Sequence, residues 1–385
     1  MHTRFARLLV LTVTFGVAVI ATTLARGLTE ETYPSLGLLN EVLGDIETQY
    51  VTEVPPAQLI HSAAVGLLDD LDGKSELLAP RGRRGDADQA ADPGLVIRRR
   101  KETLTVVTPV DGTAAHRAGV MAGDQILKID GLNARTMEPA DAAGRLRGPA
   151  TSTVVVSIMR QGWAEPRDFT LTREPPAGPT VSVRQLREGV LYLRIHRFAA
   201  ATSTELTAAL ASAGGRGLVL DLRNDAGGSV LDAVDLAQRF LEPGQLVAYS
   251  QGRRPDRQHE FRASPSAGRF TGLVVALVNQ GSGAAAEIAA GALHDWGRAV
   301  LVGTRTAGEA SVQSTIPLPD GSAVLLTTAR YFTPRGHVID GTGLPPDVEA
   351  VTTADADTQL ARALEVLTIE RTLQKRESGV RASLK

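Results

Sequence analysis

The chain has 385 residues, and 41 Lys and Arg side chains against 43 Asp and Glu side chains give a formal net charge of -2. This balance argues against a dedicated nucleic-acid-binding protein, because such domains usually carry a large basic excess. The length and a hydrophobic content of 43% predict two or three domains with packed cores, and the lack of cysteine excludes disulfides, thiolate nucleophiles and cysteine metal sites.

The N-terminus has the pattern of a targeting segment. Arg4 and Arg7 precede an uncharged, mostly apolar run over residues 8–25, which is typical of a secretory signal peptide or of a single membrane anchor. The small-residue pattern Thr23-Leu-Ala25 favours cleavage slightly, and the basic flank argues against a buried core helix. We expect residues 1–27 to be a signal peptide or membrane anchor, and the protein to be exported, periplasmic or membrane-anchored facing the periplasm.

Residues 28–80 are predicted to form a helical N-terminal segment. Apolar residues recur at three- and four-residue steps from Leu36 to Ile46 and from Leu59 to Leu68, which is the period of an amphipathic helix. The polar, charged and glycine-punctuated residues 81–92 then predict a linker or mobile loop.

From residue 93 to residue 174 the pattern changes to short strands with tight turns between them. Strands are expected around residues 104–107, 126–129 and 154–158, turns at Gly123-Asp124 and Asp130-Gly131, and a short helix at residues 140–146. These features predict one small, mostly β domain, and the proline-rich residues 174–179 predict a linker after it.

Strands and helices alternate over residues 180–350. Continuous apolar runs at residues 217–222, 273–278 and 299–302 predict strands covered on both faces, and helical patterns follow at residues 230–241 and 284–293. This order is typical of an α/β domain with parallel strands. Residues 351–385 are predicted as a C-terminal helix, over residues 358–375, and a tail.

Several motifs, in this order, resemble a known family. Residues 109–131 are similar to a PDZ domain of the bacterial protease type. Leu220-Asp-Leu-Arg-Asn-Asp-Ala-Gly-Gly228 resembles the Asp-Leu-Arg-x-Asn-x-Gly-Gly signature of carboxy-terminal processing (tail-specific) proteases, which are S41-type peptidases, with Asp225 in place of the asparagine. Residues 278–313 and 327–347 resemble later segments of the same family. The resemblance covers residues 36–350 and implies a ClpP/crotonase-like protease core with an inserted PDZ domain.

Two catalytic positions of that family are changed in this sequence. Family members use a serine nucleophile and a lysine base. Burial lowers the pKa of the lysine, so that it can lose its proton and act as a base. The serine segment reads Gly281-Ser-Gly-Ala-Ala-Ala-Glu287, which places Ala284 at the nucleophile. The lysine turn reads Thr306-Ala-Gly-Glu-Ala310, which places Glu309 at the base, and the supporting glutamine is kept as Gln313. The resemblance therefore implies a pseudoprotease.

Other residues near these motifs leave alternatives open. The resemblance assigns the oxyanion-hole positions to Gly227, Gly228 and the amide of Ala285. Alternatively, the two glycines only allow a tight strand-to-helix turn. Ser282 or Ser311 could act as a displaced nucleophile with Glu309 or His294 as the base, or these serines satisfy backbone groups in turns.

The PDZ domain offers a peptide-binding site by resemblance. Such domains hold a C-terminal carboxylate in a backbone nest and add the peptide as a strand. The carboxylate loop would be Pro93-Gly-Leu-Val-Ile97, where Gly94 permits close approach and Leu95, Val96 and Ile97 line the groove. Arg147 matches the family position that relays tail binding to the active site, or it is a solvated arginine.

The remaining patterns predict no further site. No cluster has metal-ligand spacing and no glycine-rich stretch has phosphate-cradle spacing, so neither a metal nor a cofactor is expected. His196 is expected in a strand, and the basic run Arg98–Lys101 at a solvated strand edge.

Three functions stay open at this point. The first is an inactive, exported relative of the tail-specific proteases that binds protein C-terminal tails, or an active protease paralogue, through its PDZ domain. The second is an active serine endopeptidase with a displaced nucleophile. The third is a purely structural subunit of a homo- or hetero-oligomer.

Overall fold

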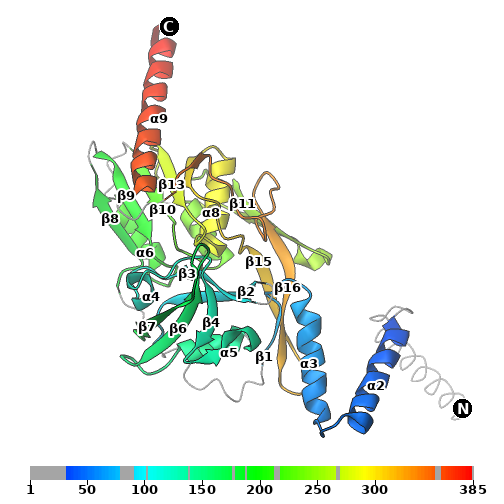
Figure 1. Ribbon diagram of the computed structural model, residues 1–385. Helices are drawn as coiled ribbons and strands as arrows, with labels where there is room; N and C mark the ends of the chain where they lie inside the picture. Colours follow the sequence, from blue (N-terminus) through cyan, green and yellow to red (C-terminus); the bar gives the residue numbers. More distant parts are fainter. Residues whose placement is uncertain are drawn as a thin grey trace, which may run out of the picture. The chain divides into compact units, whose positions relative to one another are not determined.

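Figure 1 shows the computed structural model of the chain. The structure describes residues 32–78, 91–100, 103–137, 139–175, 178–186, 189–211, 217–265, 269–351 and 357–383. The predicted signal peptide or membrane anchor lies outside these residues, as does nearly all of the predicted linker at residues 81–92. Among the described helices, none combines the length and the apolar character that crossing a bilayer demands.

The chain divides into two compact units, residues 1–67 and residues 68–385. The described part of the first unit contains α2 (Thr32–Gln49) and most of α3 (Pro56–Asp69). Both helices confirm the predicted periodicity, and α3 begins at a proline, which suits the first turn of a helix.

The predicted helical range is too long at its C-terminal end. Helix α3 ends at Asp69, and Glu76–Leu78 form strand β1, which pairs with β16 (Ala323–Phe332) in antiparallel orientation. The cause lies in the residues between them. The Asp72 carboxylate accepts the backbone N–H groups of Lys74 and Ser75 at 3.0 and 2.8 Å, and Gly73 has φ +64°. A side-chain turn and a left-handed residue together redirect the chain out of the helix.

The predicted β domain is a six-stranded antiparallel sheet with helices packed on it. Its strands run in the order β2 (Leu95–Arg100), β3 (Thr103–Pro109), β4 (Gln125–Ile129), β6 (Thr153–Met159) and β7 (Arg167–Thr172), with β5 (Leu132–Asn133) beside β4. Its helices are α4 (Ala114–Arg117), η3 (Ala134–Thr136) and α5 (Pro139–Leu146). Leu104, Ile126 and Val156 are fully buried in its core. A bridge between Asp92 and Glu174 brings the two ends of the domain together.

The larger α/β part contains the predicted parallel sheet. Its order is β17 (Val348–Glu349), β14 (Ala299–Gly303), β13 (Val274–Val278), β10 (Leu218–Asp221), β9 (Leu191–Ile195) and β8 (Val181–Gln185). All neighbouring pairs are parallel except β8 with β9. The mixed α/β fold with a β domain and N-terminal helices confirms the predicted fold class.

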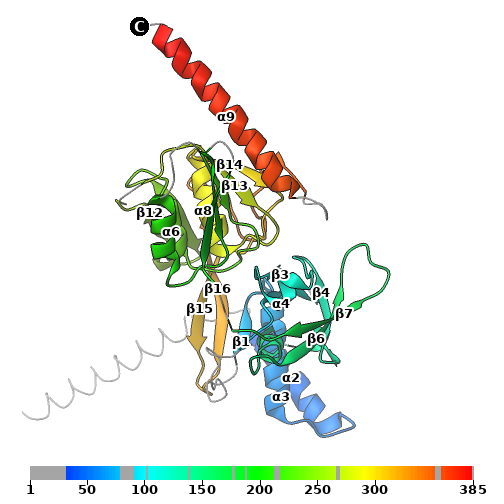
Figure 2. The same ribbon diagram turned by 90° about the vertical axis from the view of Figure 1, so that its left-hand side faces the viewer.

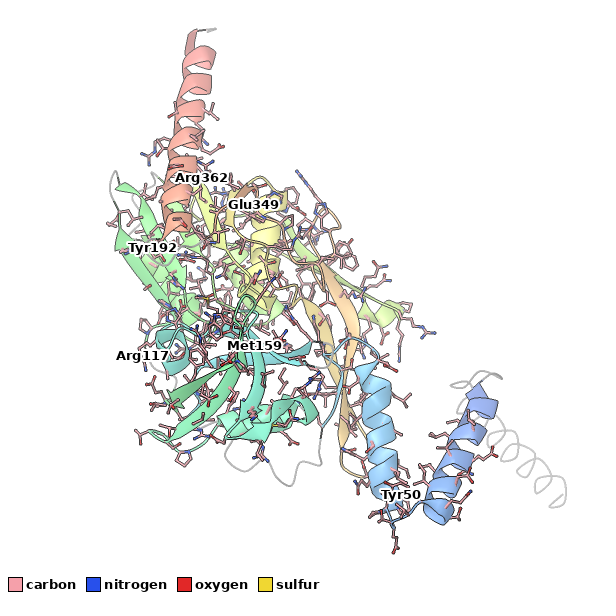
Figure 3. All side chains as sticks on the ribbon, viewed as in Figure 1. Tyr50, Arg117, Met159, Tyr192, Glu349 and Arg362 are labelled. Carbon is pink, nitrogen blue, oxygen red and sulfur yellow. The ribbon has the colours of Figure 1, made fainter. Side chains whose placement is uncertain are left out.

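Helices cover both faces of this sheet (Figure 2). Helices α6 (Thr202–Ala211), α7 (Val230–Ala237) and α8 (Ala284–Asp295) share one apolar core, which takes Leu218 and Leu220 of β10. The opposite core takes Val219, together with Tyr192 and the first half of α9 (Thr358–Ser383). Figure 3 shows Tyr192 on the sheet near the base of α9. Successive residues of a strand thus face opposite cores, which explains the continuous apolar runs.

A second sheet was not predicted from the sequence. It contains β11 (Leu246–Gly252), β12 (His259–Arg262), β15 (Ser311–Pro317), β16 and β1, with the short helix η5 (Pro255–Arg257) beside it. Strands β15 and β16 form a hairpin that begins at Ser311, two residues after Glu309. This sheet therefore fixes the direction in which the chain leaves the family's base position.

Candidate functional site

The substituted catalytic positions meet at one edge of the parallel sheet. Gly227, Ala284 and Glu309 follow the carboxyl ends of β10, β13 and β14, which are neighbours in the sheet. In parallel sheets this edge is where ligand sites form. Two backbone hydrogen bonds connect the segments directly: the Gly283 N–H donates to the Asp225 carbonyl at 2.9 Å, and the Ala307 N–H donates to the Ser282 carbonyl at 2.9 Å.

Ala284 lies where a strand-to-helix turn would present a nucleophile. It is the first residue of α8, and its φ is +45°, in the left-handed region that a residue with a Cβ seldom adopts. Such a conformation costs roughly 1–2 kcal/mol and is often found at functional sites. The strained turn is therefore present, while its side chain is a methyl group without a nucleophilic atom.

The serine two residues earlier is part of the scaffold. Ser282 is fully buried, its Oγ donates to the Leu222 carbonyl at 2.8 Å, and the same Oγ accepts the Asn279 N–H at 3.0 Å. These contacts satisfy backbone groups at the end of β10 and in the turn before α8. A hydroxyl that is held in this way does not face a substrate.

The other alternative catalytic groups also have local partners. The Ser311 Oγ accepts the Gln313 Nε2–H at 3.1 Å, and the same Nε2 donates to Thr327 at 2.7 Å. Gln313 thus bonds within the β15–β16 hairpin. His294 lies in the last turn of α8, with its Nε2 at 3.0 Å from Asp347. At about 1.5 Å of rise per residue, the helix places His294 roughly 15 Å from Ala284.

Glu287 holds the turn that carries Glu309. Its buried carboxylate accepts the Thr306 hydroxyl. It also accepts the backbone N–H groups of Gly308 and Glu309, both at 2.7 Å. Burial, the largest influence, raises the pKa of Glu287 to about 7, and the charge of Glu309 acts in the same direction, while the three donors oppose the rise. Glu287 thus connects α8 to the turn through these hydrogen bonds, a role that only the structure makes clear.

Glu287→Ala is expected to destabilise the protein by about 2–4 kcal/mol, because it leaves a buried hydroxyl and two buried backbone donors without an acceptor. Glu287→Gln retains a carbonyl oxygen in nearly the same place and should cost less. Urea unfolding at pH 8 measures both free energies. Equal stability of the Ala variant and the wild type would show that the hydrogen bonds of Glu287 do not hold the turn.

Glu309 is surrounded by three cations. Its side chain is only 6% exposed, with Oε2 at 3.3 Å from Lys74 Nζ and 3.3 Å from Arg98 Nε, and Oε1 at 3.4 Å from Arg100 Nη2. Lys74 also pairs with Asp340. Gly73 lets this segment come close, since a Cβ there would lie 2.7 Å from the Arg99 carbonyl oxygen.

This cluster corrects one prediction from the sequence. The basic run does lie on an edge strand, β2, but Arg98 and Arg100 are 39% and 48% exposed and both contact Glu309. Because alternate residues of a strand share a face, two arginines separated by one residue can reach the same carboxylate. The contact between Lys74 and Glu309 could not be predicted from the sequence, because the two residues are far apart in the chain.

Asp225 places a second buried carboxyl group beside the oxyanion positions. It is 2% exposed, its Oδ1 accepts the Gly227 N–H at 3.3 Å, and its Oδ2 has no hydrogen-bond partner among the described residues. Burial raises the pKa of Asp225 to about 8, and the charges of Asp111 and Asp232 add to this rise. The group is therefore largely protonated at neutral pH.

The backbone donors assigned to the oxyanion hole have other roles here. The Gly227 N–H donates to Asp225, and the Ala285 N–H donates to the Gly227 carbonyl at 3.3 Å. Gly228 has φ +86°, and a Cβ there would lie 2.8 Å from the Ala285 Cβ and from the Phe198 ring. Gly228 thus has a packing reason, whereas a Cβ at Gly227 would meet only Asp225 Oδ1 at 3.9 Å. Two of the three assigned amides already have an acceptor in the protein.

The β domain contacts the α/β part at a second polar cluster. The Asp111 carboxylate pairs with Arg194 and lies 3.3 Å from His196 Nδ1 and 3.4 Å from Asn224 Nδ2. Burial would raise the pKa of Asp111, but the His196 hydrogen bond and the Arg194 charge hold it below its usual value. His196 follows β9 directly rather than lying within it.

The predicted peptide-binding residues lie along β2 and at the end of α5. Leu95 and Ile97 are half-buried against the β-domain core, and Val96 lies between them. Gly94 has φ +83°, and a Cβ there would overlap the Thr113 side chain at 2.1 Å. Its N–H donates to Asp92 at 2.6 Å, so Gly94 serves the loop itself and its amide is not open to a ligand.

Arg147 directly follows α5 and is exposed. Its side chain has no hydrogen bond or ion pair with any residue in the described part of the chain. It is thus placed to be solvated or to meet a ligand, and the fold alone gives it no structural role.

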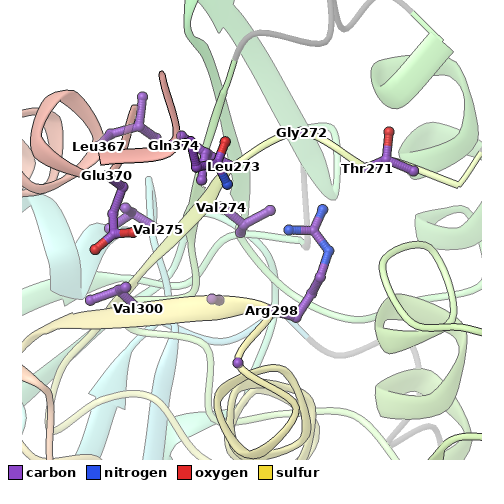
Figure 4. Close-up of a pocket in the computed structure, with 12 residues that line it drawn as sticks. Thr271, Gly272, Leu273, Val274, Val275, Arg298, Val300, Leu367, Glu370 and Gln374 are labelled. Atoms are coloured by element: carbon purple, nitrogen blue, oxygen red, sulfur yellow. The ribbon is translucent and has the colours of Figure 1, made fainter. Parts of the chain in front are cut away.

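A separate cavity of about 150 Å³ lies elsewhere (Figure 4). Its lining includes Leu273, Arg298 and Glu370, at the starts of β13 and β14 and on α9. Since Ala284 and Glu309 follow the opposite ends of these strands, this cavity does not belong to the site. Within the described residues, no group of three or more His, Asp or Glu side chains could hold a metal ion.

Comparison with known proteins supports the relationship that the motifs indicate. Residues 189–350 match Peptidase family S41, and residues 105–160 match the PDZ domain. The chain is 33% identical over 351 residues to the carboxy-terminal-processing protease of Bartonella bacilliformis, covering 86% of this chain and 79% of that protein. It is 38% identical over 292 residues to the carboxyl-terminal-processing protease of Synechocystis sp., covering 71% and 68%.

A solved structure shows the same fold. The photosystem II D1 C-terminal processing protease superposes with a TM-score of 0.70 at 29% identity, over 84% of this chain and 89% of that one. The strained turn at Ala284, the adjoining glutamate turn and the PDZ domain thus stand on a scaffold shared along most of the chain. The chain belongs to the carboxy-terminal-processing proteases of Peptidase family S41.

Proposed function

We propose that this chain is a catalytically inactive member of its family that binds protein C-terminal tails, or an active protease paralogue, through its PDZ domain. The observation that carries the proposal is the pair of side chains at the catalytic positions. Ala284 has no atom that could attack a carbonyl carbon, and Glu309 is held by three cations. The carboxylate of Glu309 stands where the family has its lysine base, and with Ala284 in place of the serine it has no hydroxyl at that position to deprotonate.

The surroundings of these residues support loss of peptide hydrolysis. The tetrahedral intermediate of acyl transfer carries negative charge that free donors must stabilise. Here the Gly227 and Ala285 amides have protein acceptors, and Asp225 and Glu309 supply carboxyl groups nearby. The contacts of Ser282 also argue against a displaced nucleophile, since its hydroxyl is buried and used twice.

Tail binding is supported by the β2 strand. It is the terminal strand of the described β-domain sheet, and α5 packs beside it. The segment at Gly73 comes close to β2 at the Arg99 carbonyl, so the edge over residues 95–98 remains for an added strand. Peptides bind PDZ domains by this kind of strand addition. Export is supported by the basic and apolar pattern of residues 1–27, which the structure does not describe.

The proposal predicts that the purified wild-type chain does not cleave an unstructured protein with an apolar C-terminus. A fluorophosphonate probe, which reacts with activated serines, should not label it either. The double variant Ala284→Ser/Glu309→Lys restores both family residues and is the positive control for a competent scaffold. Measurable cleavage by the double variant alone supports the proposal. Cleavage or labelling of the wild type would overturn it, and Ser282→Ala and Ser311→Ala would then identify the nucleophile.

A further inference from the structure

The two faces of β2 have different chemistry. Leu95 and Ile97 face the apolar core of the β domain. Arg98 and Arg100 are on the other face, where both contact Glu309. The register shift between β2 and β3 adds a residue to β3, between Thr108 and Val106, so the alternation along β2 is continuous. A strand added beside β2 would therefore have one face on an apolar surface and the other beside two guanidinium groups.

The contacts with Glu309 leave hydrogen-bond donors of these two guanidinium groups available to a ligand. Arg98 reaches it through Nε alone at 3.3 Å, and Arg100 through one terminal nitrogen at 3.4 Å. Neither contact is the short, bidentate pair that an arginine and a carboxylate form at their strongest. Both side chains are more than a third exposed, and Lys74 shares the same carboxylate. Asp340 also pairs with Lys74, so these three cations face two carboxylates, and positive charge exceeds negative charge in this cluster beside β2.

We infer that Arg98 makes this groove selective for tails with an acidic residue three positions before the C-terminal residue. The inference rests on the proposed function, because it applies only if tails bind along β2. With the last residue of an antiparallel tail opposite Leu95, successive residues lie opposite Val96, Ile97 and Arg98. Both strands advance by about 3.3 Å per residue, so this register is kept over such a short distance.

The same register separates two parts of the tail. The last residue and the second residue before it point, like Leu95 and Ile97, toward the apolar surface and should be hydrophobic. The third residue before the end points to the face of Arg98. Opposite charges directly across an antiparallel pair attract, and like charges repel, so a lysine there should be rejected. The tail is thus apolar at its end and acidic just upstream.

Glu309 competes with such a tail. Its carboxylate already contacts the guanidinium groups of Arg98 and Arg100. An Asp or Glu side chain of the tail must share these groups with Glu309 or displace it from them. This gives opposite expectations for two substitutions. Arg98→Gln removes the attraction for an acidic tail, whereas Glu309→Gln removes the competitor and should strengthen binding of an acidic tail.

The test is fluorescence anisotropy with the full chain and labelled ten-residue peptides that share an apolar end. The peptides carry Asp, Asn or Lys at the third position before the last residue. The wild type should bind the Asp peptide about fivefold more tightly than the Asn peptide, and the Lys peptide most weakly. Arg98→Gln should remove the difference between Asp and Asn. Glu309→Gln should increase it at least twofold, with little change for Asn.

Lys128→Gln is the matched control. Lys128 is an exposed cation on β4, and β3 separates β4 from β2, so its loss should leave the Asp preference intact. If all peptides bind equally to the wild type, or if Lys128→Gln removes the preference as Arg98→Gln does, the selectivity is wrong while tail binding stands. If no peptide binds, both tail binding and the selectivity built on it are wrong.

Discussion

Asp225→Asn is expected to stabilise the protein, and the gain should grow with pH. Burial raises the pKa of Asp225 to about 8 in the folded chain, against an ordinary value of 3.8. From about pH 4 to pH 8 the unfolded chain is therefore ionised at this residue while the folded chain keeps its proton. Since the folded state binds more protons, rising pH favours unfolding, and the loss of stability is complete only above pH 8.

The size of the effect follows from the shift. Each pKa unit corresponds to about 1.4 kcal/mol, so the gain on Asp225→Asn should be about 2–4 kcal/mol larger at pH 8.5 than at pH 5. Asparagine cannot ionise, has nearly the same shape, and keeps an oxygen that can accept the Gly227 N–H. It is also the residue that the family signature has at this position, so the substitution should fit the local fold.

Urea unfolding of both proteins from pH 5 to pH 9 measures this gain. Glu287 also has a raised pKa, but it titrates in both proteins and cancels in the difference. Asp256→Asn is the control, because that side chain is 54% exposed. Its replacement should change the free energy of unfolding little at any pH in this range. Stability curves of wild type and Asp225→Asn that run parallel across this range would show that the folded Asp225 titrates normally.

The strands and helices that could be predicted from the sequence are those whose hydrophobic pattern is visible within a few consecutive residues. The runs at 217–222, 273–278 and 299–302 are buried on both faces, so their strand character is visible without knowing their neighbours. Strand β15 is half-buried at its start and exposed toward its end, so no clear alternation marks it. This is why the second sheet was missed.

The same distinction applies to the site. The resemblance placed Ala284 and Glu309 at the catalytic positions because each sits in a continuous motif. The partners of Glu309 could not be predicted in that way. Lys74 comes from the turn before β1, and Arg98 comes from the β domain, so only the folded chain brings these charges together. Asp111 and Arg194, which join the β domain to the α/β part, are a second such case.

Glu309→Lys is expected to destabilise the protein by about 3 kcal/mol, which is the second large effect. Removing one partner of a buried ion pair leaves its counter-charge uncompensated, at a cost of about 3–5 kcal/mol, and the partial exposure of the arginines reduces this cost. The new ammonium group would also face Lys74, Arg98 and Arg100 instead of pairing with them. Glu309→Gln removes the charge without reversing it and should cost about half as much.

A second substitution separates charge from packing. In the Glu309→Lys background, Lys74→Gln removes one repelling cation and should recover about 1 kcal/mol, although Lys74→Gln in the wild type should be destabilising because it breaks the pairs with Glu309 and Asp340. This reversal of sign is the expected result of urea unfolding at low salt. If Lys74→Gln destabilises both backgrounds equally, the two residues are not coupled through charge.

The same charges affect any attempt to restore catalysis. A lysine base works only when its pKa falls toward neutrality, and both burial and neighbouring cations lower the pKa of an ammonium group. Lys74, Arg98 and Arg100 would therefore help a lysine at position 309 to lose its proton, at the cost of the stability that Glu309 now provides. Adding Lys74→Gln to Ala284→Ser/Glu309→Lys should raise stability and move the rise of activity with pH to higher pH. An unchanged pH profile would show that Lys74 does not act on residue 309.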